Sequence, residues 1–185
     1  VSTDDSEIAA VAQRFGADVP FIRPPRLAVD QAEMIDVIRH TIDTLALSGE
    51  QFQYLLLLQP TSPLRTTRHI NEAIELLLNT GADSVIGVTE LDHPVEWSNT
   101  LPDDLSMDEF FAGNFCSARS QSLPLRYRIN GAIYLGKIEK ILMKNSLFLK
   151  RESVAYKMKQ SCSVDIDTKV DFLLAEALLS ERKGG

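Results

Sequence analysis

Four stretches of the chain place apolar residues at intervals of three and four and begin at or near a polar capping residue. This spacing predicts amphipathic helices, because residues three and four apart share one helix face. The expected boundaries are Asp4 with Glu7 to Gly16, a start at Asp30 with Glu33, residues 70–78 ending at Gly81, and a start at Thr168 with Asp171. The apolar residues expected to face inward are Ile8, Val11, Ala12 and Phe15; Ile35, Ile38, Ile42 and Leu45; Ile70, Ala73, Ile74, Leu77 and Leu78; and Val170, Leu173, Leu174, Ala177 and Leu178.

Short apolar runs between these helices predict strands. They cover residues 19–22, 54–58, 84–88, 132–135 and 154–158. The first three alternate with helices, which is the βαβ order of a parallel sheet covered on both faces. The run 54–58 is apolar on both sides and is therefore expected at the centre of the sheet. The pattern predicts an α/β fold, a three-layer, Rossmann-like and mostly parallel sheet within a single domain of residues 1–185.

Residues 91–128 interrupt this alternation. They are rich in proline, serine, asparagine and acids, with Trp97, Phe110, Phe111 and Phe115 distributed among them. Aromatic side chains in a polar segment are typical of contact surfaces. We therefore expect residues 91–128 to form a small dimerisation excursion that packs on a second copy of the chain.

Composition narrows the classes of partner. The formal net charge is −7 and no segment supplies a basic stripe, which argues against a nucleic-acid partner. No stretch is long and apolar enough to span a bilayer, and no leader precedes Val1, so we expect a cytoplasmic protein without a membrane partner. Cys116 and Cys162 fit neither a disulfide framework nor a metal-ligand spacing, and the three histidines suggest no catalytic site.

The first candidate site follows the run 54–58. There the strand gives way to a signature loop, residues 59–65, that carries two prolines together with Gln59, Ser62 and Arg65. Ligands of open α/β sheets bind at such strand ends, although a turn of this kind can also be a simple connector. Ser62 either fixes the turn or contacts a ligand, and Arg65 either pairs with a helix acid or adds charge to a pocket.

The second candidate site is an acidic segment, residues 163–168. Asp165 and Asp167 lie two positions apart, so in an extended chain their carboxylates point to the same side. Such a pair suits Mg²⁺, which binds one or two protein carboxylates together with water and phosphate oxygens. The alternative is that Asp167 caps the following helix and Asp165 is solvated.

Four segments, in order, resemble the motifs of the acylneuraminate cytidylyltransferases. They are residues 22–30 (IRPPRLAVD), 59–65 (QPTSPLR), 128–134 (RINGAIY) and 165–171 (DIDTKVD). The resemblance covers nearly all of the chain and implies the nucleotide-diphospho-sugar transferase type of fold. It implies that CTP and a sialic-type nine-carbon sugar acid are joined in a Mg²⁺-dependent reaction that releases pyrophosphate.

The resemblance also implies roles for individual residues. Asp165 and Asp167 would hold Mg²⁺ and, with Arg128 near the phosphates, form the catalytic group. The nucleotide would be bound by Arg23, Asp30 and Ala32, and the sugar acid by Gln59, Ser62, Arg65, Asn130 and Tyr134. Phe148 would reach across a homodimer into the neighbouring site. Arg119 stands one place early for the family's interface arginine, so either Arg119 or Ser120 occupies that position.

One motif of the family has no counterpart here. The A-R-x-G-S-K loop that holds the triphosphate, and the strand before it, do not occur in these residues. We therefore expect little activity from this chain alone. Two alternatives stay open: another sugar nucleotidyltransferase of the same fold, and a non-catalytic binding domain.

Overall fold

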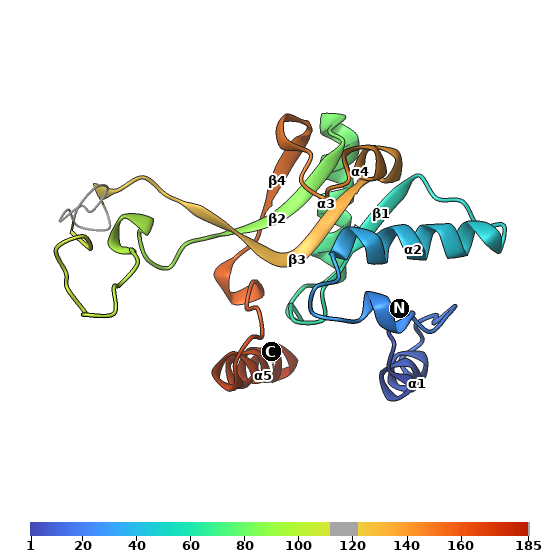
Figure 1. Cartoon of the computed structure of the whole chain (residues 1–185), viewed down its shortest axis with the longest axis horizontal. Helices are drawn as coiled ribbons and strands as arrows, with labels where there is room; N and C mark the ends of the chain where they lie inside the picture. Colours follow the sequence, from blue (N-terminus) through green and yellow to red (C-terminus); the bar gives the residue numbers. More distant parts are fainter. Residues whose placement is uncertain (112–121, 185) are drawn as a thin grey trace. The chain divides into compact units, whose positions relative to one another are not determined.

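The computed structural model describes residues 1–111 and 122–184 (Figure 1). The helices are α1 (Ser6–Arg14), α2 (Met34–Leu47), α3 (Thr67–Thr80), α4 (Ile138–Lys144) and α5 (Lys169–Gly184). The strands are β1 (Tyr54–Leu57), β2 (Ser84–Glu90), β3 (Tyr127–Lys137) and β4 (Ser153–Lys157). This composition confirms the α/β class, and β1, β2 and β4 lie within a few residues of their predicted positions.

The four strands form one mixed sheet in the order β1-β3-β2-β4. Strands β2 and β4 are parallel, in a register that runs from Ser84 opposite Ser153 to Val88 opposite Lys157. The expectation of a central position for residues 54–58 is wrong, because β1 is an edge strand of the described sheet. The sheet is compatible with a Rossmann-like fold, and the three-layer, mostly parallel arrangement remains a prediction.

The described chain divides into two compact units. The first contains residues 1–55 and 136–152, and the second contains residues 56–135 and 153–185. In the first unit Arg39 donates to the side-chain oxygen of Asn145 at 2.9 Å, which links α2 to the end of α4. In the second unit α3 packs against β2 and β4 (Figure 1). The core of the second unit consists of Ala73, Leu77, Val85, Ala132, Ile133, Leu135 and Met158.

Local sequence signals fixed several helix ends as expected. Helix α3 ends at Gly81, which adopts the left-handed conformation. Thr168 and Asp171 form hydrogen bonds with each other's backbone N–H groups at the start of α5. The first helix is capped by Asp5 rather than Asp4, and the Asp5 carboxylate accepts from the N–H groups of the next turn. The expected cap at Asp30 is wrong, because α2 begins at Met34.

The expected inward faces of the first and last helices are largely exposed. Phe15 on α1 is 81% exposed and Val170 on α5 is 72% exposed, and the buried residues of these helices are Ala9 and Ala175. Periodicity identifies an apolar face, but it does not specify what covers that face. The strand expected over residues 19–22 is also wrong, since this region forms one isolated bridge between Thr3 and Ile22.

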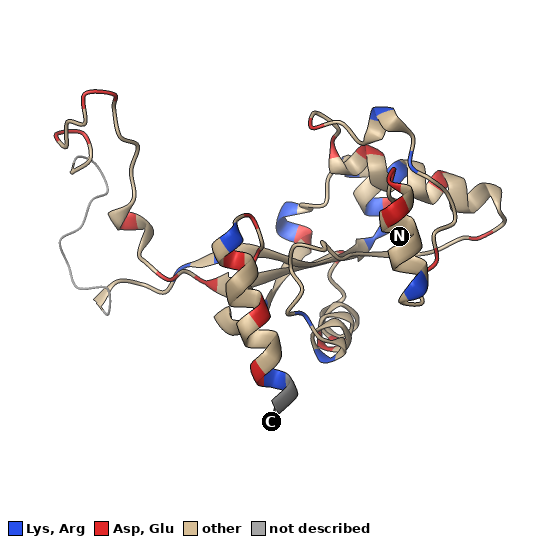
Figure 2. Ribbon diagram, turned by 90° about the horizontal axis from the view of Figure 1, so that it is seen from below, with Lys and Arg blue, Asp and Glu red and all other residues tan. Residues whose placement is uncertain are grey.

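Basic and acidic residues are interspersed along the described part of the chain (Figure 2). Three ion pairs illustrate this mixture: Arg23 with Asp4, Arg68 with Glu72, and Arg126 with Glu96. None of the helices in residues 1–111 and 122–184 is long and apolar enough to cross a membrane.

Candidate active site

The signature loop leaves β1 and is fixed from within by Arg65. The Arg65 guanidinium donates to the carbonyl oxygen of Gln59 at 3.2 Å and to that of Ala132 on β3 at 2.9 Å. Burial lowers the pKa of Arg65 from its ordinary value. Leu64 is fully buried and anchors the same loop in the interior. The Arg65 side chain thus binds the loop backbone to β3.

Ser62 is also buried and turned toward β3. Its hydroxyl donates to the carbonyl oxygen of Asn130 at 3.3 Å, and its N–H donates to Gln59 O at 3.3 Å. These bonds close a turn within the loop and hold it beside the middle of β3. Gln59 and Ser62 therefore come from a loop whose conformation is determined by the backbone of β3.

Gly131 is the point at which the loop and the acidic segment meet. Its φ is +73°, and a Cβ atom placed on it would lie 2.8 Å from Gln59 Oε1, 3.1 Å from Ser62 Oγ and 3.3 Å from Asp165 Oδ2. Three side-chain oxygens from distant parts of the sequence thus converge on one backbone position. A glycine is needed there because any larger residue would occupy the space between these oxygens.

Asp165 is half-buried, and its two carboxylate oxygens have different surroundings. Oδ2 lies near Gly131, as described above. Asp165 Oδ1 is buried and has no hydrogen-bond partner in the described part of the protein. The neighbouring Ile166 N–H donates to Thr61 O at 2.9 Å, which fixes the acidic segment to the signature loop. A buried carboxylate oxygen without a partner is costly unless a cation or a donor binds it.

Asp167 and Asp171 differ in their roles. Asp167 is exposed, whereas the Asp171 carboxylate accepts from the hydroxyl and the N–H of Thr168, both at 2.7 Å. The hydroxyl bond is the main reason that the pKa of Asp171 is lowered. Asp171 therefore caps α5, which leaves Asp165 and Asp167 as the two acids of the segment that are not used for capping.

Strand β3 supplies Arg128 and Tyr134 near the acidic segment, and Asn130 between them in sequence. Arg128 donates to the carbonyl oxygen of Ser163 at 3.3 Å, so its guanidinium lies against the acidic segment. Tyr134 is half-buried, and its pKa is raised by burial first and by the charge of Asp165 second. Both side chains therefore lie near the acidic segment.

Asn130 occupies an interior position. The side chain is fully buried, and its amide nitrogen donates to Ser163 Oγ at 2.9 Å and contacts Met158 Sδ at 3.2 Å. Its amide oxygen accepts from Ala132 N at 3.1 Å. The hydrogen-bonding groups of this side chain are thus used within the protein, where they connect β3 to Ser163.

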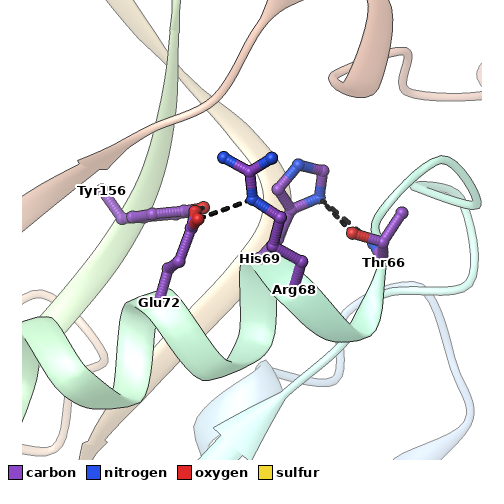
Figure 3. A network of polar contacts seen from close by, with 5 residues as sticks. All are labelled: Thr66, Arg68, His69, Glu72 and Tyr156. Atoms are coloured by element: carbon purple, nitrogen blue, oxygen red, sulfur yellow. Dashed lines mark hydrogen bonds and ion pairs between the residues drawn. The ribbon is translucent and has the colours of Figure 1, made fainter.

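The start of α3, directly after the signature loop, carries a polar network (Figure 3). Thr66 N–H donates to His69 Nδ1 at 3.1 Å, and Arg68 pairs with Glu72 at 2.6 Å. The Tyr156 hydroxyl donates to the second oxygen of Glu72. This hydrogen bond, followed by that from Arg68, lowers the pKa of Glu72, whereas burial lowers the pKa of His69. The network connects β4 to the first turns of α3.

The residues predicted for nucleotide binding belong to the first unit. Arg23 donates to Asp4 at 3.3 Å, and its Nε is buried without a hydrogen-bond partner in the described residues, as is Ser2 Oγ. Asp30 is exposed and Ala32 is half-buried. Phe148 is 50% exposed and lies in the same unit. Arg119 and Ser120 lie outside the described residues.

Known proteins resemble this chain over almost its whole length. The N-acylneuraminate cytidylyltransferase of Escherichia coli is 34% identical over 176 residues, which are 95% of this chain and 40% of that protein. The CMP-N,N'-diacetyllegionaminic acid synthase of Legionella pneumophila is 33% identical over 187 residues, which are 97% of this chain and 76% of that protein. This chain belongs to the acylneuraminate cytidylyltransferase family. The family predicted from the sequence is thereby confirmed.

Other comparisons define the limits of this assignment. The pseudaminic acid cytidylyltransferase of Campylobacter jejuni, a relative named for a different sugar acid, is 28% identical over 178 residues. No protein-family model matches the chain. The chain spans less than half the length of the Escherichia coli cytidylyltransferase and about three quarters of the Legionella synthase.

Two positions of the site were not assigned a role from sequence. Gly131 was part of a motif, and a glycine inside an otherwise apolar strand is a recognisable signal of close backbone approach. Ser163 gives no such signal, although it is 1% exposed and bonds to Asn130 and to the carbonyl oxygen of Lys159. The cytidylyltransferase motifs 59–65, 128–134 and 165–171 thus lie together in the second unit.

Proposed function

We propose that the protein is a cytidylyltransferase that joins CMP, taken from CTP, to the anomeric hydroxyl of a sialic-type nine-carbon sugar acid. The observation that carries this proposal is the convergence of Gln59, Ser62 and Asp165 oxygens on Gly131. A polyhydroxylated acid needs several fixed hydrogen-bonding groups, and a nucleotide phosphate needs a cation nearby. The signature loop offers the hydrogen-bonding groups, and the acidic segment offers a proposed place for the cation.

The chain's own residues would bind and orient the two substrates. The Gln59 amide and the Tyr134 hydroxyl are the proposed hydrogen-bonding contacts to the sugar acid, and the charge of Asp165 contributes to the raised pKa of Tyr134. Arg128, held near Ser163, supplies a planar cation that matches phosphate oxygens. Arg65 and Asn130 contribute by fixing the loop and β3.

The residues present fit a magnesium ion. Asp165 has a buried oxygen without a hydrogen-bond partner in the described residues, and Asp167 is exposed two positions on. No group of three or more His, Cys, Asp or Glu side chains in the described residues could hold a metal ion. With only these two protein carboxylates as ligands, the proposed Mg²⁺ would be held by Asp165 and Asp167 and would take its other ligands from water and substrate oxygens, and it would withdraw charge from the phosphates.

In the proposed reaction the anomeric oxygen of the sugar acid forms a bond to the α-phosphorus of CTP. The bond between that phosphorus and the bridging oxygen breaks, pyrophosphate leaves, and the hydroxyl proton passes to water. The protein would align the attacking oxygen with the phosphorus and stabilise the developing charge. Arg23, Asp30 and Ala32 are the proposed nucleotide contacts, and the buried Nε of Arg23 has no hydrogen-bond partner among the residues that the structure describes.

The proposal extends to assembly. Residues 91–128 are the proposed dimer contact, with Phe148 and either Arg119 or Ser120 reaching the neighbouring site of a homodimer in the cytoplasm. Neither nucleic acid nor a membrane surface is a proposed partner.

The test is a substrate panel with the full-length protein. CTP, ATP, GTP and UTP are each combined with sialic, legionaminic and pseudaminic acids and with sugar phosphates, and pyrophosphate release is measured with and without Mg²⁺. The proposal predicts release with CTP and a sugar acid in Mg²⁺, and its abolition in Asp165→Asn. Release with sugar phosphates alone would favour another nucleotidyltransferase, and no release with any pair would favour a binding domain.

A further inference from the structure

Arg182, near the end of α5, contacts the signature loop and the two residues just before the acidic segment, although it belongs to none of the four motifs. Its Nη1 donates to Leu64 O in the signature loop at 2.8 Å. Its Nη2 donates to Ser161 O at 3.0 Å and to Cys162 Sγ at 3.0 Å, just before the acidic segment. One guanidinium thus bridges two backbone segments that are about 100 residues apart in sequence.

The position of Arg182 along the chain gives these bonds a geometric consequence. The chain runs from Ser161 through the acidic segment, turns into α5 at Lys169 and returns to Arg182. The bond between Arg182 and Ser161 O therefore closes a loop across a separation of 21 residues that contains Asp165. Through the bond to Leu64 O, the same Arg182 side chain also connects residues 161–182 to the signature loop.

A second link joins the same two segments. Ile166 N–H donates to Thr61 O at 2.9 Å, next to Asp165. Two links thus connect the signature loop to residues 161–166. One is the backbone hydrogen bond from Ile166 to Thr61, and the other is formed by the Arg182 side chain. The side-chain link needs a planar fork with several donors, which arginine has and lysine lacks.

We propose that Arg182 is a positioning residue: it sets the spacing between residues 59–65 and 161–166 that brings Gln59, Ser62 and Asp165 together around Gly131. Its effect on turnover rests on the proposed function, whereas its effect on the two segments does not. A displacement of about 1 Å in reacting groups can cost about 10²-fold in rate. The loss of this link is therefore expected to reduce turnover and, at the same time, to raise the Mg²⁺ concentration needed for half-maximal activity.

The experiment compares Arg182→Lys with Arg68→Lys in the full-length protein. Arg68 is an exposed arginine of α3 that pairs with Glu72 of the same helix, so it controls for the chemistry of the substitution. Amide hydrogen exchange is followed by mass spectrometry in peptides covering 59–66, 161–167 and, as an internal reference, 84–90 in β2. Pyrophosphate release is measured against Mg²⁺ concentration.

Arg182→Lys is expected to speed exchange in 59–66 and 161–167 by about tenfold relative to 84–90, as local openings become easier. It should also lower turnover at least tenfold and raise the Mg²⁺ concentration needed for half-maximal activity, while Arg68→Lys changes neither. Unchanged exchange in 59–66 and 161–167, equal changes in all three peptides, or an unchanged Mg²⁺ requirement in an active enzyme would overturn the proposal. If the unmodified protein releases no pyrophosphate, the proposed function fails and the exchange data alone decide the role of Arg182.

Discussion

Gly131→Ala perturbs the convergence of side chains most directly. The new methyl group would stand 2.8 Å from Gln59 Oε1, 3.1 Å from Ser62 Oγ and 3.3 Å from Asp165 Oδ2. Ordinary contacts begin near 3.4 Å, so Gln59 must retreat by about 0.6 Å and Ser62 by about 0.3 Å. The long Gln59 side chain can turn away, whereas Ser62 is buried and bonded to β3.

The free energy of this substitution has two parts. An alanine at positive φ costs about 1 kcal/mol, and crowding of buried neighbours adds about 1–2 kcal/mol. Gly81→Ala is a matched control, because Gly81 has φ +66° and nothing lies within 4 Å of the position of its added Cβ. We expect Gly81→Ala to lose about 1 kcal/mol of unfolding free energy and Gly131→Ala about 2–3 kcal/mol.

Activity should separate the two variants more sharply than stability. A shift of several tenths of an ångström in the groups around Gly131 is expected to reduce turnover about 10–100-fold, while Gly81→Ala stays close to the unmodified protein. Urea unfolding gives the stability and pyrophosphate release gives the turnover. Equal turnover in the two variants would refute the idea that the oxygens around Gly131 form the site.

Three further outcomes follow from other contacts. Asp167→Ala should lower turnover by about 10²-fold with little change in stability, because this acid is exposed and is proposed to bind the cation. His69→Gln keeps an acceptor for Thr66 N–H but does not titrate. Since burial lowers the pKa of His69 below 6.5, the unfolded chain takes up the proton first, and the unmodified protein should lose stability relative to His69→Gln as the pH falls below about 6.5. Tyr156→Phe should raise the pKa of Glu72, as followed by NMR, and the resulting loss of stability should shrink as acid protonates Glu72.

Each of these has a contradicting result. Near-normal turnover of Asp167→Ala at saturating Mg²⁺ would remove Asp167 from the site. Parallel pH profiles for the unmodified protein and His69→Gln in urea unfolding would show that folding does not lower the pKa of His69. An unchanged Glu72 titration in Tyr156→Phe would show that the hydroxyl does not determine the acidity of that carboxyl group.

Features that depend on a few neighbouring residues were predictable from sequence. The end of α3 at Gly81 and the cap formed by Thr168 and Asp171 each depend on local backbone geometry and on hydrogen bonds within one turn. The edge position of β1 depends on which strands pair, and a short apolar run carries little information about its neighbours. The exposed face of α1 likewise depends on packing partners that periodicity does not identify.

The site shows the same division. The residue types of the signature loop and of the acidic segment suggested the proposed chemistry, because each motif is contiguous in the sequence. The meeting of Gln59, Gly131 and Asp165 could not be read from the chain, since it requires the spatial arrangement of three segments. Ser163 and Arg182 act through backbone and side-chain contacts that leave no pattern in one sequence.

The number of phosphorus atoms in the product tests the proposed function most directly. Full-length protein is incubated with CTP, Mg²⁺ and a nine-carbon sugar acid, and the product is examined by ³¹P NMR and mass spectrometry. Transfer of CMP to a hydroxyl predicts a phosphodiester with one phosphorus resonance and the combined mass of CMP and the sugar acid less water. A product with two linked phosphorus atoms, formed from a sugar phosphate, or the absence of any product with every sugar acid, would contradict the proposed function.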